Sequence, residues 1–133
     1  MRQKQVWRHA RGFHGELGLD ERLARPTDER QVADAVSKGA TLETGGMRLT
    51  DNGLDRGFFY APTLLNNVTP DMLIYRDETF GPVAPLIAFD TDEEALAMAN
   101  DTNYGLAAYI YTQDISRAMR MLEGLRFAIV GIN

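Results

Sequence analysis

The second half of the chain alternates between short apolar runs and amphipathic stretches. Residues 83–89 ("VAPLIAF") are a nearly continuous apolar run, typical of a strand that is covered on both faces. Residues 105–112 ("GLAAYIYT") predict the next strand, with Tyr109 and Tyr111 on one face, and residues 127–132 ("FAIVGI") predict a third buried strand. The segments between them, 91–100 and 114–124, have apolar residues at helical spacing. Strand, helix, strand, helix, strand with short connections predicts a parallel sheet. The fold class that follows is α/β, a mostly parallel sheet with flanking helices.

Capping signals predict where these two helices begin. Thr91 precedes the first helix, and Glu94 three residues later completes a capping box. Asp114 is in the same position before the second helix.

The first half of the chain contains one further predicted helix. It begins with Thr27 or Asp28 as N-cap, with Gln31 in a capping-box position, and ends at Gly39, which can adopt a left-handed conformation. Its apolar residues on one face are Val32, Ala35 and Val36.

Two more strands are predicted on either side of a polar loop. Residues 40–44 ("ATLET") form the first, closed by two glycines, and residues 58–65 ("FFYAPTLL") form the second. Pro62 interrupts the second run, which favours an edge strand or a bulge because proline has no N–H to donate.

Charge divides the chain unevenly. Residues 1–30 carry seven basic and five acidic side chains, whereas the whole chain has a net charge of −5. The start also lacks periodicity, so we expect an irregular basic arm at residues 1–26 and a domain at 27–133. The acidic balance argues against nucleic acid as a partner. No apolar run reaches the length of a membrane span, and no secretory signal is visible, so we expect a cytoplasmic protein.

Side chains for independent catalysis are scarce. The chain has no cysteine, which excludes thiolate zinc sites and cysteine nucleophiles within it. Ser37 and Ser116 lie in predicted helices without a nucleophile-elbow motif, and no glycine-rich phosphate loop is present. His9 and His14 lie in the basic arm without the frame of a metal site. We therefore expect no catalytic residue and no metal site in this chain.

The stretch "YRDETFGPVAPLIAF" offers one candidate. Glu78 and Phe80 directly precede a Gly-Pro turn that leads into a predicted strand, a position from which side chains often face ligands. The alternative is structural: Asp77 and Glu78 cap the turn and Phe80 packs in the core. From these residues alone we favour the structural alternative, because one acid and one aromatic form a weak constellation.

From about residue 28 to the end, the sequence resembles the aldehyde dehydrogenase superfamily. "ETFGPV" is similar to its Glu-x-Phe-Gly-Pro signature, and "PLIAF", "ANDTNYGLAAYIYT" and "VGIN" look most like the succinate-semialdehyde dehydrogenase branch. The resemblance implies that Glu78 accepts hydrogen bonds from the nicotinamide ribose hydroxyls and that Phe80 lies near the nicotinamide ring. It also implies part of an aldehyde dehydrogenase catalytic domain, a small aldehyde substrate, NAD or NADP as cofactor, and a homo-oligomer.

The chain departs from that family in what it lacks. The family's nucleophilic cysteine, general-base glutamate, oxyanion asparagine and dinucleotide-binding domain have no counterpart here. We therefore expect a fragment that is inactive alone. One alternative is a non-enzymatic, truncated remnant that self-associates through its exposed sheet. A simple nucleotide-binding module is a further possibility, although the phosphate-binding elements are absent.

Overall fold

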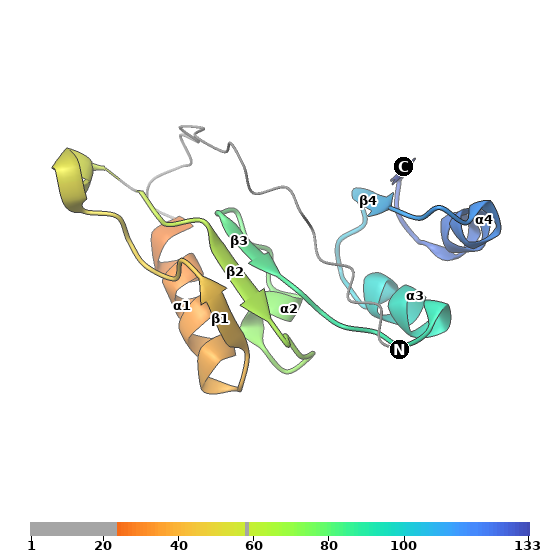
Figure 1. Ribbon diagram of the computed structural model, residues 1–133, viewed down its shortest axis with the longest axis horizontal. Helices are drawn as coiled ribbons and strands as arrows, with labels where there is room; N and C mark the ends of the chain where they lie inside the picture. Colours follow the sequence, from red (N-terminus) through yellow and green to blue (C-terminus); the bar gives the residue numbers. More distant parts are fainter. Residues whose placement is uncertain (1–23, 58) are drawn as a thin grey trace. The chain divides into compact units, whose positions relative to one another are not determined.

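The computed structural model describes residues 24–57 and 59–133, and the chain divides into two compact units (Figure 1). The described residues up to Ala88 belong to one unit, and Phe89–Asn133 belong to the other. Most of the predicted basic arm lies outside the described residues.

A three-stranded sheet forms the centre of the first unit. It consists of β1 (Thr41–Thr44), β2 (Thr63–Asn66) and β3 (Val83–Pro85), with β2 in the middle. β2 is antiparallel to β1 and parallel to β3. Residues Thr63 and Leu65 of β2 are buried, whereas Leu64 and Asn66 are partly exposed, so one face of the sheet is covered.

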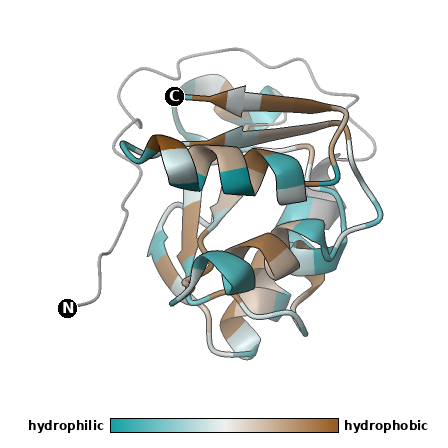
Figure 2. Cartoon of the chain, turned by 90° about the vertical axis from the view of Figure 1, so that its right-hand side faces the viewer, coloured by the Kyte–Doolittle hydropathy of each residue, from teal (hydrophilic) through white to brown (hydrophobic). Residues whose placement is uncertain are grey.

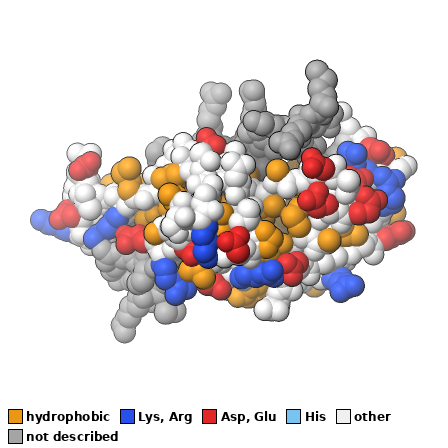
Figure 3. Space-filling view, turned by 90° about the horizontal axis from the view of Figure 1, so that it is seen from below, with side chains coloured by type: hydrophobic (Ala, Val, Ile, Leu, Met, Phe, Trp, Pro, Cys, Tyr) orange, Lys and Arg blue, Asp and Glu red, His pale blue; other side chains and the backbone are white. Residues whose placement is uncertain are grey.

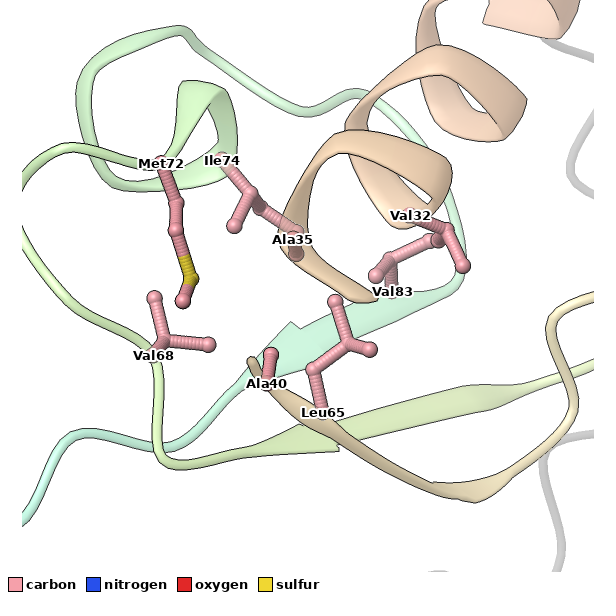
Figure 4. Close-up of a cluster of buried hydrophobic side chains, with 8 residues drawn as sticks. All are labelled: Val32, Ala35, Ala40, Leu65, Val68, Met72, Ile74 and Val83. Atoms are coloured by element: carbon pink, nitrogen blue, oxygen red, sulfur yellow. The ribbon is translucent and has the colours of Figure 1, made fainter. Parts of the chain in front are cut away.

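Three helical segments accompany this sheet. They are α1 (Ala24–Ser37), the 3₁₀ segment η1 (Asp51–Arg56) and the single turn α2 (Leu73–Arg76). α1 and α2 pack together on the covered face of the sheet (Figures 1 and 4).

The start of α1 differs from the prediction, and its end agrees with it. The helix begins at Ala24, so Thr27 and Asp28 lie inside it and the predicted N-cap was wrong. At the other end, Gly39 has φ +100°, and the Ala40 N–H donates to Ala35 O at 2.9 Å, which together form the expected glycine stop.

The core of the first unit is a small apolar cluster. Figure 4 shows side chains from α1, β2, α2 and β3 and their connecting segments meeting at this point. The cluster consists of Val32, Ala35, Ala40, Leu65, Val68, Met72, Ile74 and Val83. Val36, which we had placed on the same face, is 44% exposed and lies outside the cluster.

Two prolines set the lengths of the strands. β2 begins directly after Pro62, and it is the central strand, so the predicted edge position was wrong. β3 contains Pro85 and ends there, so the predicted strand at 83–89 is shortened to three residues. β3 is an edge strand, where a residue without an N–H costs the sheet no interior hydrogen bond.

The second unit is a β-α-β arrangement preceded by a helix. Its elements are α3 (Asp92–Asn100), β4 (Ala107–Ile110), α4 (Ile115–Gly124) and β5 (Ile129–Ile132). β4 and β5 are parallel and in register from Ala107–Ile129 to Ile110–Ile132. The α/β class is therefore confirmed, and two of the three strand pairings are parallel.

Both predicted caps in this unit are confirmed. Thr91 Oγ1 accepts from the Glu94 N–H at 3.1 Å, and Glu94 in turn accepts from the Asp90 N–H at 2.8 Å. The Asp114 carboxylate accepts from the N–H groups of Ser116 and Arg117 at 2.9 and 3.1 Å. These two N–H bonds, together with the nearby Arg117 and Arg120 charges, lower the pKa of Asp114.

Burial in the second unit is lower than predicted. The predicted single sheet is instead two sheets, because β3 pairs with β2 while β4 pairs with β5. β5 is mostly hydrophobic in composition (Figure 2), yet Ile129 and Ile132 are exposed, as is Leu106 before β4, at 75%. The predictions that residues 83–89 form a strand covered on both faces and that residues 127–132 form a buried strand were therefore wrong for the described part of the chain.

Charged side chains of both signs intermingle on the surface shown in Figure 3, where Lys and Arg lie beside Asp and Glu. Among the described residues, no helix is both long and apolar enough to cross a membrane.

Candidate functional site

The candidate residues lie on the segment that connects α2 to β3, residues 77–82, here called the 77–82 loop. Its first N–H, that of Asp77, donates to Leu73 O at 2.9 Å and closes α2. Its last carbonyl, that of Pro82, accepts from the Thr63 N–H at 2.8 Å and joins the loop to β2. Both ends of the loop are therefore attached to regular structure.

Glu78 and Phe80 both present their side chains to solvent. Phe80 is 65% exposed, so the alternative in which it packs in the core does not describe this chain. Glu78 is exposed as well, and within the described residues its carboxylate has no hydrogen-bond partner. The loop thus carries a free acceptor and a free aromatic face two residues apart.

The backbone behind these side chains is held by Gln31 of α1. Gln31 is fully buried, at 0% exposure. Its Oε1 accepts from the Thr79 hydroxyl at 2.7 Å, and its Nε2 donates to Glu78 O over a longer 3.5 Å. One amide side chain therefore contacts two successive residues of the loop.

Asp28 contacts the same loop one helical turn earlier. Its side chain lies against Gly81 so closely that a Cβ at residue 81 would overlap the carboxylate. Asp28 is 4% exposed, and its Oδ1 has no hydrogen-bond partner. Burial, with a smaller contribution from the Glu29 charge, raises the pKa of Asp28.

One ion pair and one hydrogen bond add to the attachment of α1 to this region. Arg30 and Asp77 pair at 3.4 Å on the surface, a contact of small energetic weight because both groups are well solvated. Asp34 accepts from the Leu73 N–H at 2.8 Å and pairs with Lys38 at 2.9 Å. The Leu73 hydrogen bond is the main reason that the pKa of Asp34 is lowered. Asp34 thereby fixes the start of α2.

Sequence reasoning had missed Gln31 and Asp28 as parts of this site. Both had been assigned to a capping box, although α1 begins earlier. The available signal was their spacing: positions 28, 31, 32 and 35 form one stripe of a helix, and Val32 and Ala35 on that stripe are buried. Polar residues within an apolar stripe need buried partners, and here they contact the 77–82 loop.

The other candidate residues, the two serines and the two histidines, do not form a catalytic or metal site among the described residues. Ser37 donates to Asp34 O at 2.8 Å as a helix-surface hydroxyl, and Ser116 is exposed in α4. His9 and His14 lie outside the described residues. In the described part of the chain, no three His, Asp or Glu side chains come together in a way that could hold a metal ion.

Comparison with known proteins identifies relatives of this chain. The sequence profile of the aldehyde dehydrogenase family matches residues 22–133. Human mitochondrial succinate-semialdehyde dehydrogenase is 55% identical over 105 residues, which is 79% of this chain and 19% of the human protein. The 3,6-anhydro-alpha-L-galactose dehydrogenase of Streptomyces coelicolor is 50% identical over 102 residues, 77% of this chain and 21% of that protein.

Solved structures give the same result. Succinate-semialdehyde dehydrogenase from Burkholderia pseudomallei superposes with a TM-score of 0.76 at 50% identity, covering 82% of this chain and 22% of its own. A betaine aldehyde dehydrogenase from Staphylococcus aureus, determined in complex with NAD+, superposes with a TM-score of 0.76 at 37% identity over the same shares. The chain spans about a fifth of the length of the curated relatives it matches. Since the family profile covers most of its residues, this chain belongs to the aldehyde dehydrogenase family.

Proposed function

We propose that this chain is the part of an NAD(P)+-dependent aldehyde dehydrogenase, of the succinate-semialdehyde type, that presents Glu78 and Phe80 to the nicotinamide cofactor. The observation that carries the proposal is the 77–82 loop, which is anchored at both ends and presents both side chains to solvent. The similarity to succinate-semialdehyde dehydrogenases supports the substrate class.

The chemistry of the two side chains suits a nicotinamide nucleoside. An ionised carboxylate only accepts hydrogen bonds, so Glu78 can receive both hydroxyls of a ribose diol. Phe80 offers an apolar face for a flat ring. The cofactor itself, NAD or NADP, supplies the hydride acceptor for aldehyde oxidation. In this proposal, the chain's residues bind and orient that group.

The rest of the reaction requires residues that this chain does not contain. Aldehyde oxidation through a thiol adduct needs a cysteine nucleophile, and the chain has no cysteine. We therefore assign no catalytic residue to it, and we propose that the 133 residues alone do not oxidise an aldehyde.

A chimeric enzyme tests the assignment of Glu78 and Phe80. The matching segment of Burkholderia pseudomallei succinate-semialdehyde dehydrogenase is replaced by this chain's sequence, and the KM for NAD+ is measured. Glu78→Gln should raise that KM about tenfold, because a charge-assisted hydrogen bond is weakened. Phe80→Ala should raise it as well, and the control Asp77→Asn, one residue away, should not. An unchanged KM for NAD+ in both Glu78→Gln and Phe80→Ala would contradict the proposal.

A second candidate function is self-association, which the exposed apolar side chains of the second unit favour. Leu106, Tyr109, Ile115 and Ile129 are each more than half exposed. Sheet edges and apolar faces of this kind promote pairing with another chain. Sedimentation of the isolated chain distinguishes the two functions: a clean monomer at high concentration contradicts the self-associating remnant and leaves the cofactor proposal standing.

The homo-oligomeric state and the cytoplasmic location also remain proposals. The human relative is described as mitochondrial. Sedimentation and microscopy of the tagged chain would test them.

A further inference from the structure

We infer that Gln31 is a positioning residue. Its buried side-chain amide forms hydrogen bonds with Thr79 and with Glu78 O, and it thereby orients the Glu78 and Phe80 side chains toward the cofactor. The inference rests on the proposed function of these two side chains. It concerns a residue of α1 that lies far from the "ETFGPV" motif in the sequence.

Gln31 is a buried amide whose oxygen and nitrogen both have hydrogen-bond partners. A buried side-chain amide must find partners for its oxygen and its nitrogen. Gln31 has no exposed surface, and both of its partners lie on the 77–82 loop. The 2.7 Å bond from the Thr79 hydroxyl is the strong one, and the 3.5 Å contact with Glu78 O is weak. The loop therefore satisfies Gln31, and Gln31 in turn fixes the loop.

The anchored residue Thr79 lies between the two exposed ones. Thr79 lies between Glu78 and Phe80 in sequence, and its side chain points to Gln31 while the other two side chains are exposed. Fixing the residue between them limits the rotation of the backbone that carries both. The ends of the loop are held by Leu73 O and the Thr63 N–H, so Gln31 is the contact that restrains its middle.

The other contacts of α1 with the 77–82 loop are weaker than that of Gln31. Arg30–Asp77 is a solvated surface pair, and Asp28 approaches Gly81 without a hydrogen bond to it. Among the described contacts from α1 to the 77–82 loop, the one short hydrogen bond is that between Gln31 and Thr79. Its replacement should therefore loosen residues 78–80 more than it loosens the rest of the unit.

Hydrogen exchange on the 133-residue chain tests this directly. Gln31→Met keeps the size and burial of the side chain and removes both hydrogen bonds, and Thr79→Val removes the strong one from the loop side. Both should speed exchange of the Asp77 and Thr63 amides, whose hydrogen bonds to Leu73 O and Pro82 O attach the two ends of the loop, about tenfold relative to the rest of the first unit. Val32→Ala is the control, because it weakens the same helix through the core without touching the loop.

Three results would overturn the inference. One is unchanged exchange at Asp77 and Thr63 in Gln31→Met. A second is an increase that is equally large throughout α1 and β2, as for Val32→Ala. If Gln31→Met does not fold, Thr79→Val decides the matter, and unchanged loop exchange in that variant is the third.

Cofactor kinetics in the chimera separate a positioning role from a structural one. Gln31→Met should raise the KM for NAD+ about three- to tenfold with a smaller change in kcat, whereas Val32→Ala should leave that KM unchanged. An unchanged KM in Gln31→Met, when Glu78→Gln raises it, contradicts the positioning role alone. If Glu78→Gln has no effect, the proposed function fails, and the exchange data still decide whether Gln31 fixes the loop.

Discussion

The Asp28 side chain occupies the space that any side chain at residue 81 would need. Gly81 does not have a positive φ, so glycine is required here by close approach and not by backbone conformation. Gly81→Ala should therefore overpack the contact and lower the free energy of unfolding by about 1–3 kcal/mol. Urea denaturation of the chain measures it.

Asp28→Ala provides the matched background for that substitution. With the carboxylate removed, Gly81→Ala has room, and most of its cost should disappear. An equal cost of Gly81→Ala in both backgrounds would show that the strain lies in the backbone and not in the contact with Asp28.

Asp28 also predicts a pH dependence of stability. Its pKa is raised by burial, so the folded chain binds this proton more tightly than the unfolded chain does. The resulting stabilisation is fully present below the unfolded pKa, near 3.8, and is lost as the pH rises through the raised folded pKa. Asp28→Asn, which stays neutral, should therefore gain stability relative to wild type as the pH increases from 4 to 7.

The comparison between wild type and Asp28→Asn isolates this group. Asp34 and Asp114 have lowered pKa values, so they favour folding at higher pH and would hide the effect in wild type alone. Urea denaturation of both proteins at several pH values gives the difference. A difference that is constant with pH would contradict the assignment to Asp28.

At the residue scale, the sequence predicted the exposed half of the site and missed the buried half. Glu78 and Phe80 lie in one contiguous motif, so the resemblance pointed to them directly. Gln31 and Asp28 contact residues that lie 47 or more positions further along the chain. No local sequence pattern predicts which loop a helix will contact. Knowing where α1 begins would have placed both residues on its buried stripe.

At the scale of elements, signals confined to one turn of the chain were the most reliable. The Thr91 and Asp114 caps and the Gly39 stop are as predicted, because each depends only on neighbouring residues. Which strands pair with one another was harder to predict from the sequence. Whether the run at 83–89 joins the strand before it or the strand after it depends on contacts far along the chain, and it joins β2.

The Thr91 cap carries a prediction of its own. Thr91→Ala removes the acceptor of the Glu94 N–H and should destabilise α3 by about 1 kcal/mol. Hydrogen exchange at the first turn of α3 measures the loss. Ser116→Ala, a substitution on the exposed surface of α4, is the control and should leave α3 exchange unchanged. No change in Thr91→Ala would mean that Asp92–Glu94 stabilise the helix start without the cap.

At the scale of the whole molecule, the first unit provides one well-supported loop, and the described part of the chain is not a complete catalytic apparatus. The first unit uses α1, α2 and β2 to hold the 77–82 loop. The second unit leaves Leu106 and Ile115 largely exposed, at 75% and 71%. The chain matches about a fifth of the length of its curated relatives, so the groups that would act on an aldehyde are sought in the remaining length of such a protein.

The isolated chain should therefore produce no reduced nicotinamide from succinate semialdehyde with either NAD+ or NADP+. The physical reason is the missing nucleophile: without a thiolate, no adduct forms from which a hydride can leave. Absorbance at the wavelength of reduced nicotinamide measures this, with the active chimera as the positive control. Turnover by the chain above the rate without protein would require a nucleophile among the hydroxyl or amine side chains. Repeating the assay with Glu78→Gln would then show whether the 77–82 loop takes part in that turnover.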